Sequence, residues 1–183
     1  MVPRNATRER YFAAASEILT DHGIGSLTMT ALHKRLQLSS GSFYHFFDGW
    51  DDFVAQFLDN WIEQTADISA KAQRESDPFD RLEVLRRLAA SVPHAAEAAI
   101  RMWGAAVPAV ATAQRRVDAQ RLNIIREAVS AAGVSGARAD HLARHGLSII
   151  VGWQQLSRPF DSHMLDEMLG QFIELVRGFA AAP

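Results

Sequence analysis

Hydrophobic positions recur along the chain at the three- and four-residue spacing of α-helices, and no stretch alternates long enough to predict a strand. The first helix is predicted over residues 7–22 and is stopped by Gly23. Its apolar stripe contains Tyr11, Ala14, Ala15, Ile18 and Leu19. Two short helices follow at residues 28–36 and 39–46, joined by a turn at residues 37–38. The pattern predicts an all-α protein.

The rest of the chain continues this helical pattern through to its end. A longer helix opens at residues 48–52 and carries Phe53, Phe57, Leu58, Trp61 and Ile62. Asp77 and Pro78 form a cap and a first helical residue after the polar stretch 71–77. Pro93 and Pro108 start two further helices, the second of which reaches residue 132, and the last two helices cover about residues 137–156 and 162–181. This is a total of about nine helices in two domains, residues 5–65 and 75–183.

Composition narrows the class of protein but does not name its function. The chain has 183 residues, with 19 Lys and Arg against 21 Asp and Glu, so any DNA binding must use a local surface. It contains no cysteine, which excludes thiol nucleophiles and Cys-ligated zinc. No stretch has the roughly 20 apolar residues of a membrane span, and no apolar signal core is present at the start. We therefore expect a soluble, cytoplasmic protein without membrane contact.

The segment at residues 28–53, TMTALHKRLQLSSGSFYHFFDGWDDF, has the character of a helix-turn-helix unit. Its two short helices can bury little alone, so their apolar residues must pack on the helices before and after them. These residues are Leu32, Leu36, Leu38, Phe43 and Phe46. The opposite face carries small and hydrogen-bonding side chains, as a helix that enters the major groove of DNA requires. It consists of Ser40, Gly41, Ser42, Tyr44 and His45.

This segment, together with the first helix, resembles the N-terminal domain of the TetR family of bacterial transcriptional regulators. The resemblance is carried by RYFAAASEILTDHGIGSLTM and LQLSSGSFYHFF. The residues that match the family pattern in register are Arg10, Ala14, Ala15, Gly23, Thr28, Ser39, Gly41, Ser42, Tyr44 and Phe47. Gln37 stands where the family has a glycine, and Trp50 where it has a phosphate-binding lysine.

The resemblance implies a role in DNA binding for nine residues. Phosphate contacts are expected from Thr28, Thr30, Ser39, Tyr44 and His45. Base contacts are expected from Ser40, Gly41, Ser42 and Phe43. The alternative for Phe43 and Tyr44 is that their rings only fill the core of the domain.

The second domain is expected to bind an effector and to form a homodimer. The resemblance implies an effector pocket, which we expect at the large apolar side chains of Phe79, Met102, Trp103, Trp153 and Phe160, with His94 as a polar group beside them. The alternative is that these residues are only core. The last two helices have apolar residues on more than one face, which predicts that two protomers pair through them. The predicted interface contains Leu142, Gly146, Ile149, Ile150, Trp153, Leu165, Leu169, Phe172 and Val176.

The sequence thus predicts a regulator, most simply a repressor, that binds a palindromic operator as a homodimer and is released by a small molecule. It predicts no enzyme activity and no cofactor. The alternative is a small-molecule-binding or protein-interaction dimer whose DNA-binding face has weakened, which Trp50 and the small basic charge favour. A third hypothesis, a metal-dependent enzyme using His141 and His145, has only their i, i+4 spacing and nearby Asp140 in its support.

Overall fold

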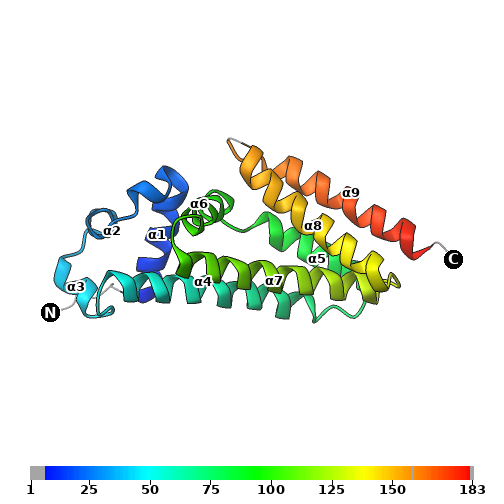
Figure 1. The fold of residues 1–183 in the computed structure, drawn as a ribbon, viewed down its shortest axis with the longest axis horizontal. Helices are drawn as coiled ribbons and strands as arrows, with labels where there is room; N and C mark the ends of the chain where they lie inside the picture. Colours follow the sequence, from blue (N-terminus) through cyan, green and yellow to red (C-terminus); the bar gives the residue numbers. More distant parts are fainter. Residues whose placement is uncertain (1–6, 158, 182–183) are drawn as a thin grey trace. The chain divides into compact units, whose positions relative to one another are not determined.

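The computed structural model describes residues 7–157 and 159–181, and these residues form nine α-helices and one short 3-10 helix without strands (Figure 1). The prediction of an all-α fold with about nine helices is confirmed. The outermost residues of the two predicted domains, 5–6 and 182–183, lie outside the described part, as does Arg4.

The helix bounds follow the predicted ones closely. The N-terminal helices are α1 (Arg8–His22), α2 (Met29–Leu36), α3 (Ser40–Tyr44) and α4 (Trp50–Ala72), with the 3-10 helix η1 (Ile24–Ser26) after α1. The others are α5 (Pro78–Ala90), α6 (His94–Gly104), α7 (Pro108–Ala131), α8 (Gly136–Leu156) and α9 (Ser162–Ala180).

Side-chain caps explain where several helices begin. The Thr28 hydroxyl accepts a hydrogen bond from the Ala31 N–H at 3.1 Å, and Asp77 accepts from the N–H groups of Phe79 and Asp80. Asp161 caps α9 in the same way. Each bond satisfies an N–H group that the helix itself leaves without a partner. Such caps are visible in the sequence, so the starts of these helices could be predicted.

The turn between α2 and α3 has a left-handed residue at Gln37, with φ 55° and ψ 40°. Among the described residues other than glycine, only Gln37 has a positive φ. A side chain in this region crowds the backbone, which is why glycine is favoured there. The turn therefore keeps the conformation of a glycine turn although the residue is glutamine.

Among the described residues, 7–62 and 93–114 form one compact unit, which we call unit 1, and 63–92, 115–157 and 159–181 form unit 2. Helix α1 packs against α2 and against α6 in unit 1. In the interior of this unit the Trp61 indole N–H donates to the Glu97 carboxylate of α6 at 3.1 Å. The compact units differ from the division predicted at residues 65–75, because α6 contributes to unit 1.

A cluster of aromatic rings forms the core of unit 1. Phe43 of α3 is fully buried, and its ring centroid lies 5.7 Å from Tyr11, 5.0 Å from Phe47 and 5.6 Å from Phe53. Tyr11 and Phe47 meet edge to face at 5.4 Å, which is a favourable geometry for aromatic pairs. The five-residue helix α3 is therefore anchored on α1 and α4 through one ring.

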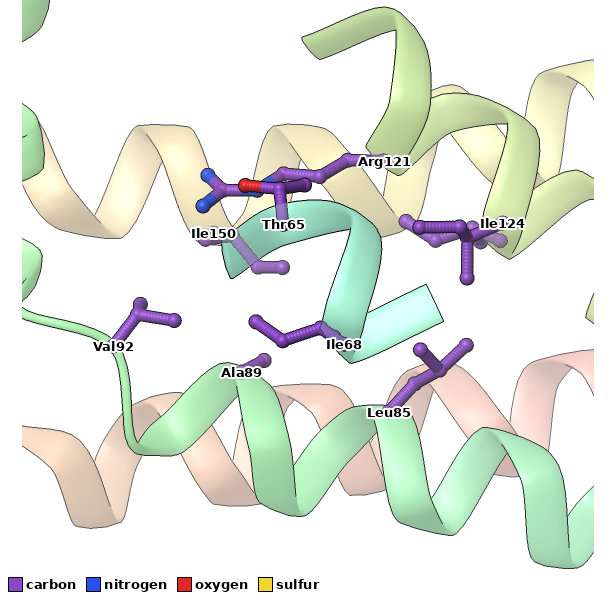
Figure 2. A pocket seen from close by; sticks show the side chains of 9 residues that line it. Thr65, Ile68, Leu85, Ala89, Val92, Arg121, Ile124 and Ile150 are labelled. Atoms are coloured by element: carbon purple, nitrogen blue, oxygen red, sulfur yellow. The ribbon is translucent and has the colours of Figure 1, made fainter. Parts of the chain in front are cut away.

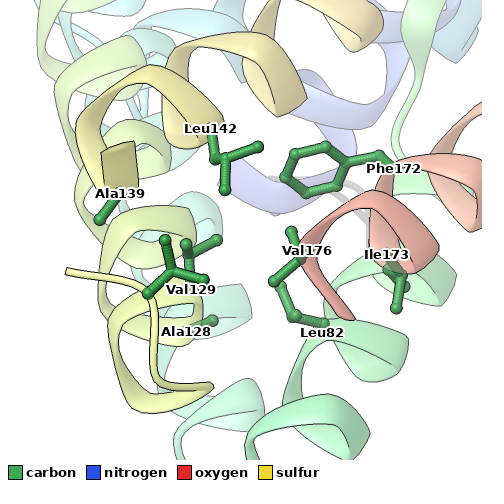
Figure 3. Close-up of a cluster of buried hydrophobic side chains, with 9 residues drawn as sticks. Leu82, Ala128, Val129, Ala139, Leu142, Phe172, Ile173 and Val176 are labelled. Carbon is green, nitrogen blue, oxygen red and sulfur yellow. The ribbon is translucent and has the colours of Figure 1, made fainter. Parts of the chain in front are cut away.

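The core of unit 2 is formed by α5, α7, α8 and α9, and of these α8 and α9 lie side by side (Figures 1 and 3). Its buried members are Leu82, Ala128, Val129, Val134, Ala139, Leu142, Phe172, Ile173 and Val176. A Cβ added to Gly146 of α8 would lie 3.0 Å from the Phe172 ring of α9. Gly146 therefore permits the close approach of these two helices within one protomer.

This packing corrects the predicted dimer interface. Leu142, Gly146, Leu165, Leu169, Phe172 and Val176 are buried within the protomer, so they are not available to a second copy. Ile149, Ile150 and Trp153 are half-buried. The broad apolar faces of α8 and α9 do not require a second protomer, because α5 and α7 cover most of them within one protomer.

The ring cluster makes a stability prediction. Phe43→Ala should lower the free energy of unfolding by about 3–5 kcal/mol, because it leaves a cavity among Tyr11, Phe47 and Phe53. Tyr44→Ala is the matched control at the next position, where the side chain is 59% exposed, and should cost under about 1 kcal/mol. Urea unfolding followed by circular dichroism measures both. Equal losses for the two variants would contradict the assignment of Phe43 as the anchor of α3.

Candidate DNA interface and ligand cavity

Helix α3 presents one narrow face outward. Ser40, Gly41, Tyr44 and His45 are exposed, as is Ser39 immediately before the helix. The Tyr44 ring rests edge-on against Phe43 at a centroid distance of 5.6 Å, which directs its hydroxyl away from the core. The helix thus offers small groups at its start and two longer hydrogen-bonding side chains at its end, as the sequence predicts.

Two residues predicted to contact bases are not on this face. Phe43 is fully buried in the ring cluster, and the Ser42 side chain is only 2% exposed. Both predictions are wrong for a physical reason: α3 makes little more than one turn, so two adjacent positions, 42 and 43, point into the domain together. For Phe43 the alternative of core filling is the correct one, whereas Tyr44 is not core.

The residues before and within α2 keep their predicted exposure. Thr28 and Thr30 are both exposed. The Thr28 oxygen accepts from the Ala31 N–H, so the hydroxyl proton is left to donate to another acceptor. Ser39 stands at the N-cap position of α3 but makes no side-chain cap bond. Its hydroxyl is therefore not committed to the helix.

The positive charge near this face is small and partly paired. The Arg35 guanidinium is held by Asp21 at 2.7 Å and by Glu17 at 3.1 Å. The hydrogen bond from Arg35 is the main cause that lowers the pKa of Asp21 below its usual value. Arg8 donates to the Phe46 carbonyl, both nitrogens at 3.4 Å, and so ties α1 to the end of the α3 turn. These arginines stabilise the domain in addition to any effect on DNA.

Trp50 begins α4 and is half-buried, with its ring 5.3 Å from that of Phe53. Two residues on, the Asp52 carboxylate accepts from the Asp48 N–H and the Gln56 amide, both at 2.9 Å. These bonds lower the pKa of Asp52, the backbone bond most. The start of α4 is thus fixed by packing and hydrogen bonds, without the cation that the resemblance would place there.

Unit 2 contains a small apolar cavity of about 60 Å³ (Figure 2). It is lined by Thr65, Ile68, Leu85, Ala89, Val92, Arg121, Ile124, Ile125 and Ile150. A second cavity of about 40 Å³ shares Leu85, Ala89, Ile125 and Ile150 with the first and extends to Phe172 and Leu169. Because four side chains are common to both, the two cavities are neighbours within one core.

The six residues predicted for an effector pocket do not line these cavities. Phe79, Trp153 and Phe160 belong to unit 2, whereas His94, Met102 and Trp103 belong to unit 1. The Phe79 ring lies under the Arg177 guanidinium at 4.1 Å, and the Trp153 indole donates to the Asp161 carbonyl at 2.7 Å. Met102 is 59% exposed. The expectation rested on large apolar side chains and one histidine, and other packing roles account for several of these residues.

Sequence reasoning did not identify Thr65 and Arg121 as residues that line the cavity. A signal for Arg121 was available, because Val117, Arg121 and Ile124 follow one another at the spacing of a single helical face. A charged residue on an apolar stripe is unusual unless it meets a partner inside the protein. Thr65, 2% exposed on α4, carries a weaker signal.

Two further features bear on the alternatives. Within residues 7–157 and 159–181 no three His, Asp or Glu side chains are grouped as metal ligands, and His141 and His145 are both exposed. In the same part of the chain, no helix combines the length and the apolar character needed to cross a bilayer.

Comparison with known proteins agrees with this geometry. Residues 12–57 match the sequence model of bacterial regulatory proteins of the tetR family. A comparison with curated protein sequences gave no match. The fold is similar to that of a transcriptional regulator from Rhodococcus sp. Rha1, with a TM-score of 0.78 and 18% identity over 97% of this chain and 100% of that one.

Two other solved structures show the same likeness. A TetR transcription regulator from Haloarcula marismortui has a TM-score of 0.71 and 23% identity, over 94% of this chain and 95% of that one. A transcriptional regulator from Saccharomonospora viridis, solved in complex with choline, has a TM-score of 0.75 and 18% identity, over 91% and 95% of the two chains. Residues 12–57 thus carry the sequence pattern of the tetR family, and the chain shares its fold with these transcriptional regulators.

Proposed function

We propose that this protein is a repressor that binds a palindromic operator as a homodimer through α3 and is released from DNA by a small molecule. The observation that carries the DNA-binding part is the exposed face of α3, held outward by the buried Phe43 ring. Its side chains suit the two tasks of a recognition helix. Tyr44 and His45 reach phosphates, while Ser40 and the bare backbone at Gly41 face base edges. The function is binding rather than catalysis.

The proposed dimer uses the outer face of α9 rather than the buried residues first expected. Met164 and Leu175 are each 39% exposed, and Phe179 is 36% exposed. Met164, Met168, Gln171 and Leu175 follow one another at steps of four, three and four residues, so they lie along one face of the helix. Two such faces can pair about a two-fold axis, as isologous interfaces do.

Release by an effector follows from linkage. The dimer has one state whose recognition helices are spaced to fit the operator and another state in which they are not. A small molecule that binds the second state more tightly shifts the dimer toward it. DNA binding weakens by the ratio of the ligand's affinities for the two states. The choline bound to the similar Saccharomonospora viridis protein supports a small-molecule site in this fold.

A mobility-shift assay tests the DNA-binding part directly. The purified chain should retard DNA from upstream of its own gene. Tyr44→Phe should weaken binding about three- to tenfold on every sequence, because it removes one phosphate hydrogen bond and no base contact. Ser40→Ala should instead change which bases are preferred. A folded dimer that retards no DNA would favour the alternative, a small-molecule-binding or protein-interaction dimer with a weakened DNA face.

Trp50 offers a second test, because it stands where a cation would meet a phosphate. In Trp50→Lys the magnitude of the slope of log affinity against log salt concentration should rise by about 0.9 per subunit, or about 1.8 per dimer, since each new phosphate contact releases counterions. Binding at low salt should also become stronger. An unchanged slope in a folded variant would show that position 50 does not face phosphate.

The dimer is tested by sedimentation velocity at micromolar protein concentration. Leu175→Arg should produce a monomer, because it places a charge in the centre of the proposed apolar face. Ser76→Arg, at an exposed position outside any helix, is the control that adds the same charge and should remain a dimer. A wild-type monomer, or a dimer unaffected by Leu175→Arg, would rule out this interface.

A further inference from the structure

Helices α8 and α9 carry opposite charges at the two edges of their shared outer surface. His141 and Arg144 are exposed on α8 and form a cationic edge, whereas Glu167 and Glu174 are exposed on α9 and form an acidic edge. We propose that each protomer of the dimer lays its cationic edge on the acidic edge of its partner, so that Arg144 meets Glu174 of the partner subunit. The inference rests on the homodimer proposed above and specifies how the two copies are oriented in it.

The two helices run antiparallel and side by side (Figure 1). The His145 ring of α8 and the Phe172 ring of α9 have centroids 5.9 Å apart, which relates the positions along one helix to those along the other. Arg144 lies one residue before His145, and Glu174 lies two residues after Phe172, so both are displaced in the same direction. At a rise of about 1.5 Å per residue, these displacements are about 1.5 Å and about 3 Å. Arg144 and Glu174 therefore lie at nearly the same level along the helix pair.

Apolar side chains lie between the two edges. Six large hydrophobic residues are exposed in the described part of the chain, and four of them belong to α8 and α9. These four are Leu156, Met164, Leu175 and Phe179. A Cβ added to Gly152 of α8 would meet no atom within 4 Å, so this position leaves room for a helix of another copy. An apolar strip between charged edges is typical of a surface that another protein covers.

The charged groups of the two edges have few interactions within the protomer. Arg144 makes no ion pair within residues 7–157 and 159–181. Glu174 is 71% exposed and lies 3.4 Å from Arg177 of its own helix, and Glu167 lies 3.5 Å from the exposed His163. Ion pairs of this kind at a surface contribute little to stability. Either carboxylate can therefore turn to a cation of the second copy at little cost.

One acidic residue of α8, Asp140, is close to the cationic edge. Its carboxylate lies 4.0 Å from the Arg126 guanidinium of α7, so this acid has a cation beside it that does not belong to the edge. The positive charge of Arg144 is therefore not cancelled by Asp140.

These charges decide between two ways of pairing the surfaces about a two-fold axis. An axis across the helices lays α8 on α8 and α9 on α9, which brings like charges together. An axis along the helices lays α8 of each protomer on α9 of the other and keeps residues of one level together. Only this second arrangement brings Arg144 to Glu174 of the partner subunit, and the symmetry repeats the contact twice. Opposite charges at matching places select such an orientation, and like charges oppose the other one.

Charge reversal in the full chain tests the pairing by sedimentation velocity over a range of protein concentrations. Arg144→Glu and Glu174→Arg should each raise the dissociation constant of the dimer about tenfold, because each places like charges together at two symmetric contacts. The variant with both changes should return to within about threefold of the wild type, because both pairs are restored with reversed sign. Arg116→Glu, at an exposed position of α7, is the matched control and should dimerise like the wild type. A double variant as weak as the single ones would overturn the pairing.

Cross-linking provides a second test that does not depend on the strength of the ion pairs. The chain contains no cysteine, so cysteines can be placed at chosen positions without side reactions. A short bis-maleimide should link two chains that carry both Arg144→Cys and Glu174→Cys, and neither change alone should give a linked dimer. A linked dimer of the Arg144→Cys chain alone would show α8 lying on α8 and would overturn the proposal.

The outcomes separate this orientation from the proposed function. A wild-type dimer that neither charge reversal weakens overturns the orientation alone. A wild-type monomer overturns the homodimer and this orientation with it. The mobility-shift assay decides DNA binding in either case.

Discussion

The burial of one ring, Phe43, is the constraint on which the DNA-binding half depends. Helix α3 has five residues, and an isolated helix of that length is unstable because nucleation costs more than its few hydrogen bonds return. Burial of a phenylalanine contributes about 1.5–3 kcal/mol, and each aromatic contact adds to it. The rings of α1 and α4 therefore define both the existence of α3 and the direction in which it points.

The same anchoring determines what the DNA-binding face can be. With Phe43 and Ser42 directed inward, α3 presents Ser40, Gly41 and Tyr44 outward. Arg35 is held by two carboxylates and Trp50 packs on Phe53, so little positive charge is free to supply a general attraction to DNA. In the DNA complex proposed above, affinity depends more on the fit of hydrogen bonds to phosphates and bases than on net charge.

Unit 2 combines a tightly packed core with a neighbouring region that is loosely packed. Gly146 lets α8 approach α9 until the Phe172 ring is in contact, whereas Ala89 and Ile150 leave empty space nearby. At about 24 cal/mol per Å³, a cavity of about 60 Å³ costs about 1.5 kcal/mol of stability. A larger side chain at position 89 would remove that cost, because Ala89 lines the cavity.

Local sequence determined most of the secondary structure, because helix period, caps and stops act between residues a few positions apart. Examples are the N-caps Thr28 and Asp77, the first residue of α7 at Pro108, and the turn at Gln37. The TetR-type domain could also be identified, since its pattern lies within one short segment. Only the tertiary structure decided which faces are covered. Phe172 and Leu142 turned inward and Arg121 came to line a cavity, because a periodic stripe shows that residues share a face but not which distant helix packs on it.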